Sequence, residues 1–187
     1  SQGKYEEALD YYNKALTIKI NKLGEDHPHV ASTYNNIAVV YDDQGKYEEA
    51  LDYYNKALTI RINKLGEDHP DVAMTYNNIG EVYDSQGKYE EALDYYNKDL
   101  TISINKLGED HPDVATTYNN IANVYDSQGK YEEALDYFNK ALTIRINKLG
   151  EDHPSVATTY NNIAIVYKKQ GKYEEALDYY NKALTIR

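Results

Sequence analysis

Apolar residues recur along the chain with the spacing of an amphipathic α-helix. Between Pro70 and Ser85, a helical wheel advancing about 100° per residue gathers six small or apolar residues within about 60° of one line. These residues are Val72, Ala73, Tyr76, Ile79, Gly80 and Tyr83. The pattern predicts a helix over 70–85 that buries one face.

A second amphipathic pattern runs from about Lys88 to Leu107. Seven side chains share one face, namely Tyr89, Ala92, Leu93, Tyr96, Leu100, Ile104 and Leu107. Glu90 falls in the first turn and Lys106 in the last, which suits the helix dipole. Glycines at 87 and 108 are expected to end the two helices, because glycine favours the left-handed position at a helix C-terminus.

This pair of patterns repeats every 42 residues. The sequence QGKYEEALDY begins at Gln2, Gln44, Gln86, Gln128 and Gln170, and residues 44–85 match residues 86–127 at 37 of 42 positions. Two amphipathic helices cannot bury their faces alone, but stacked copies can, so we expect an all-α solenoid of antiparallel helix pairs. Recurring Gly and Pro interrupt any heptad pattern, which disfavours a coiled coil. We expect one repeat array over 1–187, with a lone second helix in 1–24 and helix pairs in 28–66, 70–108, 112–150 and 154–187.

These residues resemble the tetratricopeptide repeat family, in the 42-residue form of kinesin light chains. The matching positions in one repeat are Tyr76, Ile79, Gly80, Tyr83, Gly87, Tyr89, Ala92 and Tyr96. The resemblance implies a right-handed superhelix whose concave groove is lined mainly by the first helix of each pair. It also implies binding of a protein or peptide partner, without catalysis.

Differences between repeats concentrate on one stripe of the first helices, beside asparagines that all repeats share. By the resemblance, this stripe faces the groove. The expected peptide-binding residues are Ser32, Asn35, Val39, Asp42, Met74, Asn77, Glu81, Asp84, Thr116, Asn119, Asn123, Asp126, Thr158, Asn161, Ile165 and Lys168. An Asn amide donates and accepts hydrogen bonds, so it can pair with a peptide backbone. In the alternative reading, the asparagines cap or solvate a repeat edge and the exposed positions drift neutrally.

Charge narrows the choice of partners. The chain has 20 Lys and Arg against 31 Asp and Glu, a formal net charge of −11, so phosphate-rich partners such as nucleic acid and anionic membranes are not expected. The stripe carries Asp42, Glu81, Asp84 and Asp126, and Lys168 only in the last repeat. We therefore expect neutral or basic partner segments rather than acidic ones. No apolar run reaches the roughly 20 residues of a membrane span and no signal peptide is visible, which favours a cytoplasmic protein.

No catalytic, metal or cofactor site is expected. The recurring EDHP segment offers Asp and His, as in Asp68 and His69, but equivalent histidines lie a helix pair apart and are too distant to share one ion. Helix capping and a turn explain EDHP better. Serines lack a recurrent His partner, there is no Cys, and no Gly-rich phosphate loop exists, so an enzyme is not expected.

Other readings remain open. The chain could be a ligand-free spacer fragment, or a consensus-like or designed array used as a folding model. It begins with a second helix and carries no polar capping helix, so end-to-end self-association through the terminal faces is expected.

One repeat departs from the others in its second helix. Asp99 stands where other repeats carry Ala, and Ser103 stands where they carry Lys19, Arg61, Arg145 and Arg187. We expect Asp99 to have drifted at an open edge, so that Asp99→Ala raises stability by about 1 kcal/mol or less. The alternative is a local contact with a partner.

Overall fold

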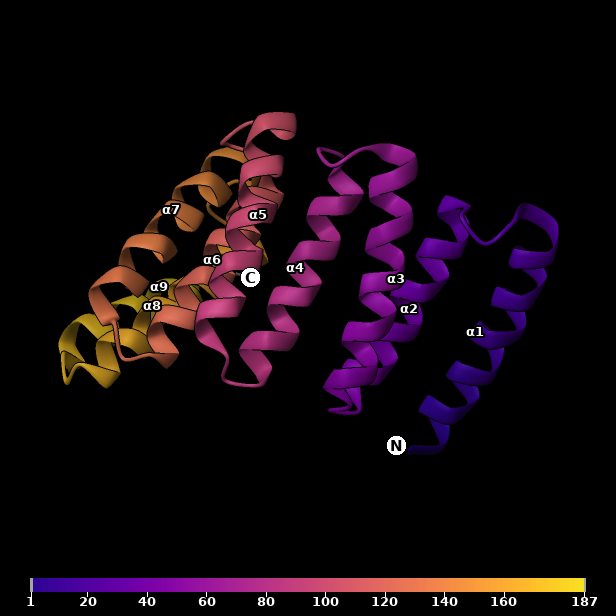
Figure 1. The fold of residues 1–187 in the computed structure, drawn as a ribbon. Helices are drawn as coiled ribbons and strands as arrows, with labels where there is room; N and C mark the ends of the chain where they lie inside the picture. Colours follow the sequence, from indigo (N-terminus) through magenta and orange to yellow (C-terminus); the bar gives the residue numbers. More distant parts are fainter. Residues whose placement is uncertain (1, 187) are drawn as a thin grey trace. The chain divides into compact units, whose positions relative to one another are not determined.

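The computed structural model describes residues 2–186, and this range contains nine α-helices and no β-strand (Figure 1). The helices are α1 (Gln2–Leu23), α2 (Pro28–Asp43), α3 (Tyr47–Leu65), α4 (Pro70–Ser85), α5 (Tyr89–Leu107), α6 (Pro112–Ser127), α7 (Tyr131–Leu149), α8 (Pro154–Lys169) and α9 (Tyr173–Thr185). We call the even-numbered helices first helices and the odd-numbered ones second helices. First helices pack on the second helices that follow them, as α2 does on α3 and α6 on α7. The prediction of an all-α fold made of helix pairs is confirmed.

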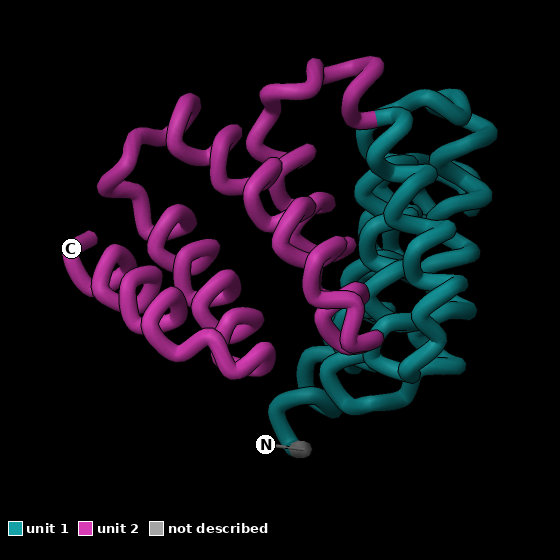
Figure 2. The backbone as a smooth tube through the Cα atoms, turned by 90° about the vertical axis from the view of Figure 1, so that its left-hand side faces the viewer, with its two compact units in different colours: residues 1–102 teal, residues 103–187 magenta. Residues whose placement is uncertain are grey.

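The chain divides into two compact units between Ile102 and Ser103, within α5 (Figure 2). Unit 1 holds α1 to α4 and most of α5, and unit 2 holds the last turn of α5 and α6 to α9. The expectation of one repeat array over the whole chain stays a prediction. Ser1 and Arg187, at the outer limits of that array, lie outside the described residues.

Each first helix begins at a proline that follows a capping histidine. At the start of α4, Nδ1 of His69 accepts a hydrogen bond from the backbone N–H of Asp71 at 3.1 Å. Pro70 follows at the first position, where its missing N–H is no loss. The same cap begins α2, α6 and α8, at His27, His111 and His153. These contacts confirm that the EDHP segment caps a helix.

The predicted helix ends are also confirmed. Gly87 has a φ of 72° and Gly108 a φ of 93°, left-handed values that a side chain rarely adopts. Within residues 2–186, no helix has the length and apolar character that crossing a membrane requires.

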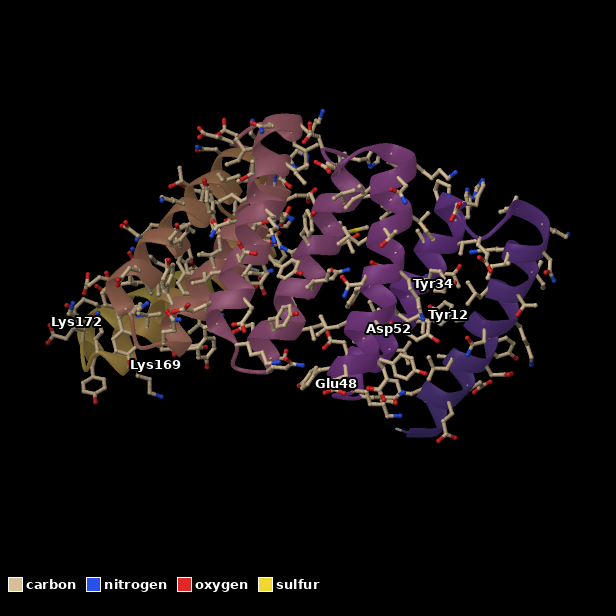
Figure 3. The ribbon with its side chains drawn as sticks, viewed as in Figure 1. Tyr12, Tyr34, Glu48, Asp52, Lys169 and Lys172 are labelled. Carbon is tan, nitrogen blue, oxygen red and sulfur yellow. The ribbon has the colours of Figure 1, made fainter. Side chains whose placement is uncertain are left out.

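Each core lies between helix pairs and is rich in tyrosine. In unit 1, Tyr54 is buried with Ala38, Ile79 and Val82, so α3 packs on both neighbouring first helices. At the edge of each pair, three further tyrosines cluster. The ring of Tyr53 lies 5.5 Å from that of Tyr41 and 5.9 Å from that of Tyr34, which Figure 3 labels. These three rings are half-buried, which leaves their polar tips near the surface.

Candidate functional site

The predicted binding residues lie on the first helices, as a stripe of mostly accessible side chains. Nine are exposed: Ser32, Val39, Met74, Glu81, Thr116, Thr158, Asn161, Ile165 and Lys168. Six are half-buried: Asp42, Asn77, Asp84, Asn119, Asn123 and Asp126. Asn35 alone among them is buried. Within unit 1 the stripe runs over α2 and α4, and within unit 2 over α6 and α8.

Exposed apolar side chains on the first helices all belong to this stripe. Val39 is 40% exposed, Met74 is 47% exposed and Ile165 is 40% exposed, and the other large apolar residues of these helices are more covered. Exposed apolar groups grouped among polar ones often mark an interaction surface. The stripe therefore combines contact area with polar groups.

Two of the shared asparagines, Asn35 and Asn119, accept hydrogen bonds within the chain. Oδ1 of Asn35 accepts hydrogen bonds from Nη1 of Arg61 at 3.4 Å and from Nδ2 of Asn78 at 3.2 Å. In unit 2, Oδ1 of Asn119 accepts likewise from Arg145 at 3.5 Å and from Asn162 at 3.1 Å. These bonds favour the reading in which the asparagines satisfy a repeat edge. Their proposed binding of a ligand backbone stays a prediction.

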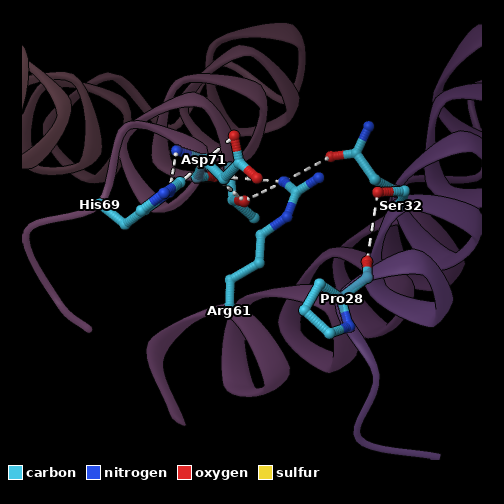
Figure 4. Close-up of polar contacts among 7 residues, drawn as sticks. Pro28, Ser32, Arg61, His69 and Asp71 are labelled. Carbon is cyan, nitrogen blue, oxygen red and sulfur yellow. Dashed lines mark hydrogen bonds and ion pairs between the residues drawn. The ribbon is translucent and has the colours of Figure 1, made fainter. Parts of the chain in front are cut away.

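A buried arginine joins three helices in unit 1. Nη1 of Arg61, which is 3% exposed, donates to Oγ1 of Thr75 at 2.6 Å and to the carbonyl of Asp71 at 3.2 Å, in addition to Asn35. Figure 4 shows Arg61 of α3 between Asp71 of α4 and Ser32 of α2. Burial lowers the pKa of the Arg61 guanidinium, and the Asp71 carboxylate acts in the opposite direction. We call this cluster the arginine bridge.

Unit 2 repeats the arginine bridge. Nη1 of Arg145 donates to Oγ1 of Thr159 at 2.6 Å and to the carbonyl of Ser155 at 3.3 Å. The sequence does not predict this cluster directly, because a lone Arg on a helix is usually solvated. The signal was a threonine on each first helix, at 33, 75, 117 and 159, together with a basic residue 14 positions before three of them.

The expectation that Asp99 lies at an open edge is wrong. Asp99 is only 4% exposed, and its Oδ2 accepts a hydrogen bond from Nδ2 of Asn77 at 2.9 Å. Burial of a carboxylate is costly unless the group accepts hydrogen bonds. Asp99 is buried and accepts one, which is not what neutral drift at an exposed position would produce. Arg187, which shares the repeat position of Ser103, lies outside the described residues.

Carboxylates gather at the C-terminal ends of α2 and α4. Burial raises the pKa of Asp42 and Asp84, and Asp43 raises that of Asp42 further. Burial, and after it Asp42 and Glu81, raise the pKa of the Tyr54 phenol, which packs against residues of both helices. Among the described residues, no cation forms an ion pair with Asp42, Asp43 or Asp84.

The corresponding end of unit 2 is neutralised. Nζ of Lys169 lies 2.7 Å from Oδ2 of Asp126, and Nζ of Lys172 lies 3.8 Å from Oε1 of Glu132. Figure 3 labels both lysines. Lys168 is exposed beside them. The stripe is thus acidic in unit 1 and mixed in charge in unit 2.

Other polar sites are weaker candidates. Within residues 2–186, no three His, Asp or Glu side chains come together in a way that could hold a metal ion. The rings of His27 and His29 do meet, with centroids 5.0 Å apart, but they form only a pair. Cavities of about 380 and 370 Å³ lie at two turns, one lined by residues 107–112 with Lys148 and the other by residues 23–28 with Lys64.

Comparison with known proteins identifies a repeat family along the chain. A family model described as tetratricopeptide repeat matches residues 1–63, 43–103, 86–147 and 113–187. No curated protein sequence matches the chain.

Solved structures share the fold. BtubC (BKLC) from P. vanneervenii is 29% identical with a TM-score of 0.85, over 100% of this chain and 74% of that one. A Podosopora anserina putative kinesin light chain with nearly identical TPR-like repeats is 22% identical with a TM-score of 0.78, over 99% of this chain and 88% of that one. The apo form of RapI is 23% identical with a TM-score of 0.80, over 99% of this chain and 49% of that one. The last two similarities show the fold alone.

Proposed function

The chain belongs to the tetratricopeptide repeat family, and on that premise we propose that it is a non-catalytic interaction module that binds a peptide or a partner segment along its first helices. The observation that carries this proposal is the position of Val39, Met74 and Ile165. On four helices whose apolar residues are otherwise well covered, these exposed side chains all fall on one stripe. An extended segment laid along the stripe of unit 1 would cover Val39 and Met74, and one laid along the stripe of unit 2 would cover Ile165.

The chemistry of the stripe favours neutral or basic segments of a protein partner. Asp42, Glu81 and Asp84 would repel an acidic peptide, and the net charge of −11 acts in the same direction. The sixteen stripe residues remain the proposed binding residues. Asn35 and Asn119 act mainly as supports, because their oxygens already accept hydrogen bonds within the chain.

A selection from random 12-residue peptides on the whole chain tests this function. Selected peptides should shift backbone amide NMR signals of the first helices at residues 32–43, 74–85, 116–126 or 158–168. The double variant Val39→Asn with Met74→Gln removes exposed apolar surface without touching the core. It should weaken peptides that bind unit 1 about thirtyfold, since each of the two side chains contributes about 1 kcal/mol.

The control is Asn55→Gln, at an exposed position of α3 outside the stripe, which should leave affinity unchanged. Selection of no peptide, or shifts confined to second helices, would contradict the proposal and favour a ligand-free spacer. Sedimentation of the same samples tests the predicted self-association.

A further inference from the structure

Equivalent positions of the two units carry different charges. Positions two repeats apart differ by 84 residues, so Asp42 corresponds to Asp126 and Ser85 corresponds to Lys169. In unit 2, Lys169 of α8 reaches across to Asp126 of α6, with 2.7 Å between Nζ and Oδ2. In unit 1, the lysine is replaced by a serine and the aspartate remains.

The neighbouring first helices pack alike in the two units. Nδ2 of Asn78 lies 3.2 Å from Oδ1 of Asn35, and the equivalent distance between Asn162 and Asn119 is 3.1 Å. The arginine bridges also agree, because both arginines lie 2.6 Å from their threonine hydroxyls. Asp42 and Ser85 therefore occupy the places that Asp126 and Lys169 occupy in unit 2.

The position in unit 1 that corresponds to the Lys169 ammonium of unit 2 lies among negative charges and beside an apolar side chain. Among the described residues, Asp42 and Asp43 have no cationic partner. Burial and, after it, Asp43 raise the pKa of the Asp42 carboxylate, so a cation placed beside it would be stabilising. Val39, one helical turn before Asp42, is 40% exposed.

We propose that unit 1 binds a partner segment with a lysine or arginine next to an apolar residue. The cation lies against Asp42, where Lys169 lies against Asp126 in unit 2, and the apolar residue covers Val39. Unit 2 does not bind such a cation, because Lys169 already forms an ion pair with Asp126 and the nearby Lys168 repels a second cation. This inference rests on the proposed function, to which it adds the position and the charge of one contact.

Three peptides of equal length test the charge. Each has a central residue between two leucines, and this residue is lysine, norleucine or glutamate. On the whole chain at low salt, the lysine peptide should bind about fivefold tighter than the norleucine peptide, and the glutamate peptide should bind weakest. The NMR shifts of the lysine peptide should fall on residues 35–43 and 78–85.

A matched pair of variants tests the position. Ser85→Lys supplies the ammonium internally and should reduce the lysine peptide to the affinity of the norleucine peptide. Ser127→Lys is the control, because it adds the same charge at the same repeat position of α6; it should preserve the fivefold preference. The reverse variant, Lys169→Ser, frees Asp126 and should give unit 2 a lysine preference of its own.

The outcomes separate this inference from the proposed function. If the three peptides bind the stripe equally, or if Ser85→Lys leaves the lysine preference intact, the inference is overturned and the proposed function stands. If no peptide shifts any stripe residue, both are contradicted.

Discussion

The helix pairs α2–α3 and α4–α5 are close copies that bury side chains of opposite charge, Arg61 in the first pair and Asp99 in the second. Helices α3 and α5 have the same sequence except at two positions, where Ala57 and Arg61 are replaced by Asp99 and Ser103. Both replacements are buried, and together they exchange a cation for an anion one turn away. A change of this kind would leave an unpaired charge unless a neighbour adapted.

Asparagine is the neighbour that adapts. Asn35 presents its oxygen to the Arg61 guanidinium, whereas Asn77 presents its Nδ2 to the Asp99 carboxylate. One amide carries a donor and an acceptor, so the same residue serves either charge. The comparison explains Asn35 and Asn77 without reference to a ligand.

Removal of the guanidinium should have the largest effect. Arg61→Met keeps the aliphatic volume but removes three hydrogen bonds from a buried site, so the free energy of unfolding should fall by about 3 kcal/mol. Denaturant unfolding measures the change. Arg145→Met is the matched variant in unit 2 and should lose a similar amount; a loss below about 0.5 kcal/mol in both would show that the arginine bridge is not stabilising.

Removal of the carboxylate should have the next largest effect. Asp99→Ala gives α5 the residue found in α3, yet it leaves Nδ2 of Asn77 without this acceptor, so stability should fall by about 2 kcal/mol. Asp99→Asn retains a side-chain oxygen and should lose less. A rise in the midpoint for Asp99→Ala would restore the drift interpretation that the sequence favoured.

Substitution of the small residue that packs beside each buried tyrosine, Ala38 beside Tyr54 and Gly80 beside Tyr96, should change stability less. A Cβ at Gly80 would lie 2.8 Å from Cε1 of Tyr96, so Gly80→Ala should lower stability by about 1 kcal/mol although alanine favours helices. Ala38→Gly, beside Tyr54, should also lose about 1 kcal/mol, in this case through helix propensity. A gain in stability for Gly80→Ala would mean that Tyr96 moves aside without strain.

The half-buried carboxylates should give the smallest effect, and it should depend on pH. The pKa of Asp42 is raised in the folded state, so its ionisation opposes folding above that pKa, and the penalty disappears below the unfolded-state value. Asp42→Asn should therefore raise stability by about 0.5 kcal/mol at pH 7 and have no effect near pH 3.

Asp84→Asn is the companion variant for this pH test. It should gain less at pH 7, because burial alone raises the pKa of Asp84. Thermal melts at the two pH values decide, and an equal gain at acid pH would exclude an ionisation effect.

The fold could be predicted because its signals are local. The apolar period, Pro70 at the start of α4 and Gly87 at its end act within a few residues, and the repeat then places every helix. Polar pairing across repeats could not be predicted, because Asn35 meets Asn78 at a separation of 43 residues on another helix. A helical wheel gives the face of a residue but not its partner on the next helix.

For the candidate site, the exposed face could be predicted from the sequence, but the contacts between helices could not. The stripe itself follows from one helix and its repeats, and exposed Val39 and Met74 lie where the sequence places them. The difference between Ser85 and Lys169 was visible in the sequence, but its meaning depends on Asp126 being within reach. Asp99 was misjudged because its repeat position suggested an edge, and the burial of that edge depends on neighbouring helices.

The histidine caps tie the start of every first helix to one tautomer. Each Nδ1 accepts a backbone hydrogen bond, so the ring proton must reside on Nε2. The residue two positions after the capping histidine differs between repeats. At His69 and His111, a carboxylate oxygen of Asp71 or Asp113 lies 4.0 or 3.6 Å from Nδ1. His27 and His153 are followed there by His29 and Ser155 instead, so the same tautomer serves caps with and without a neighbouring carboxylate.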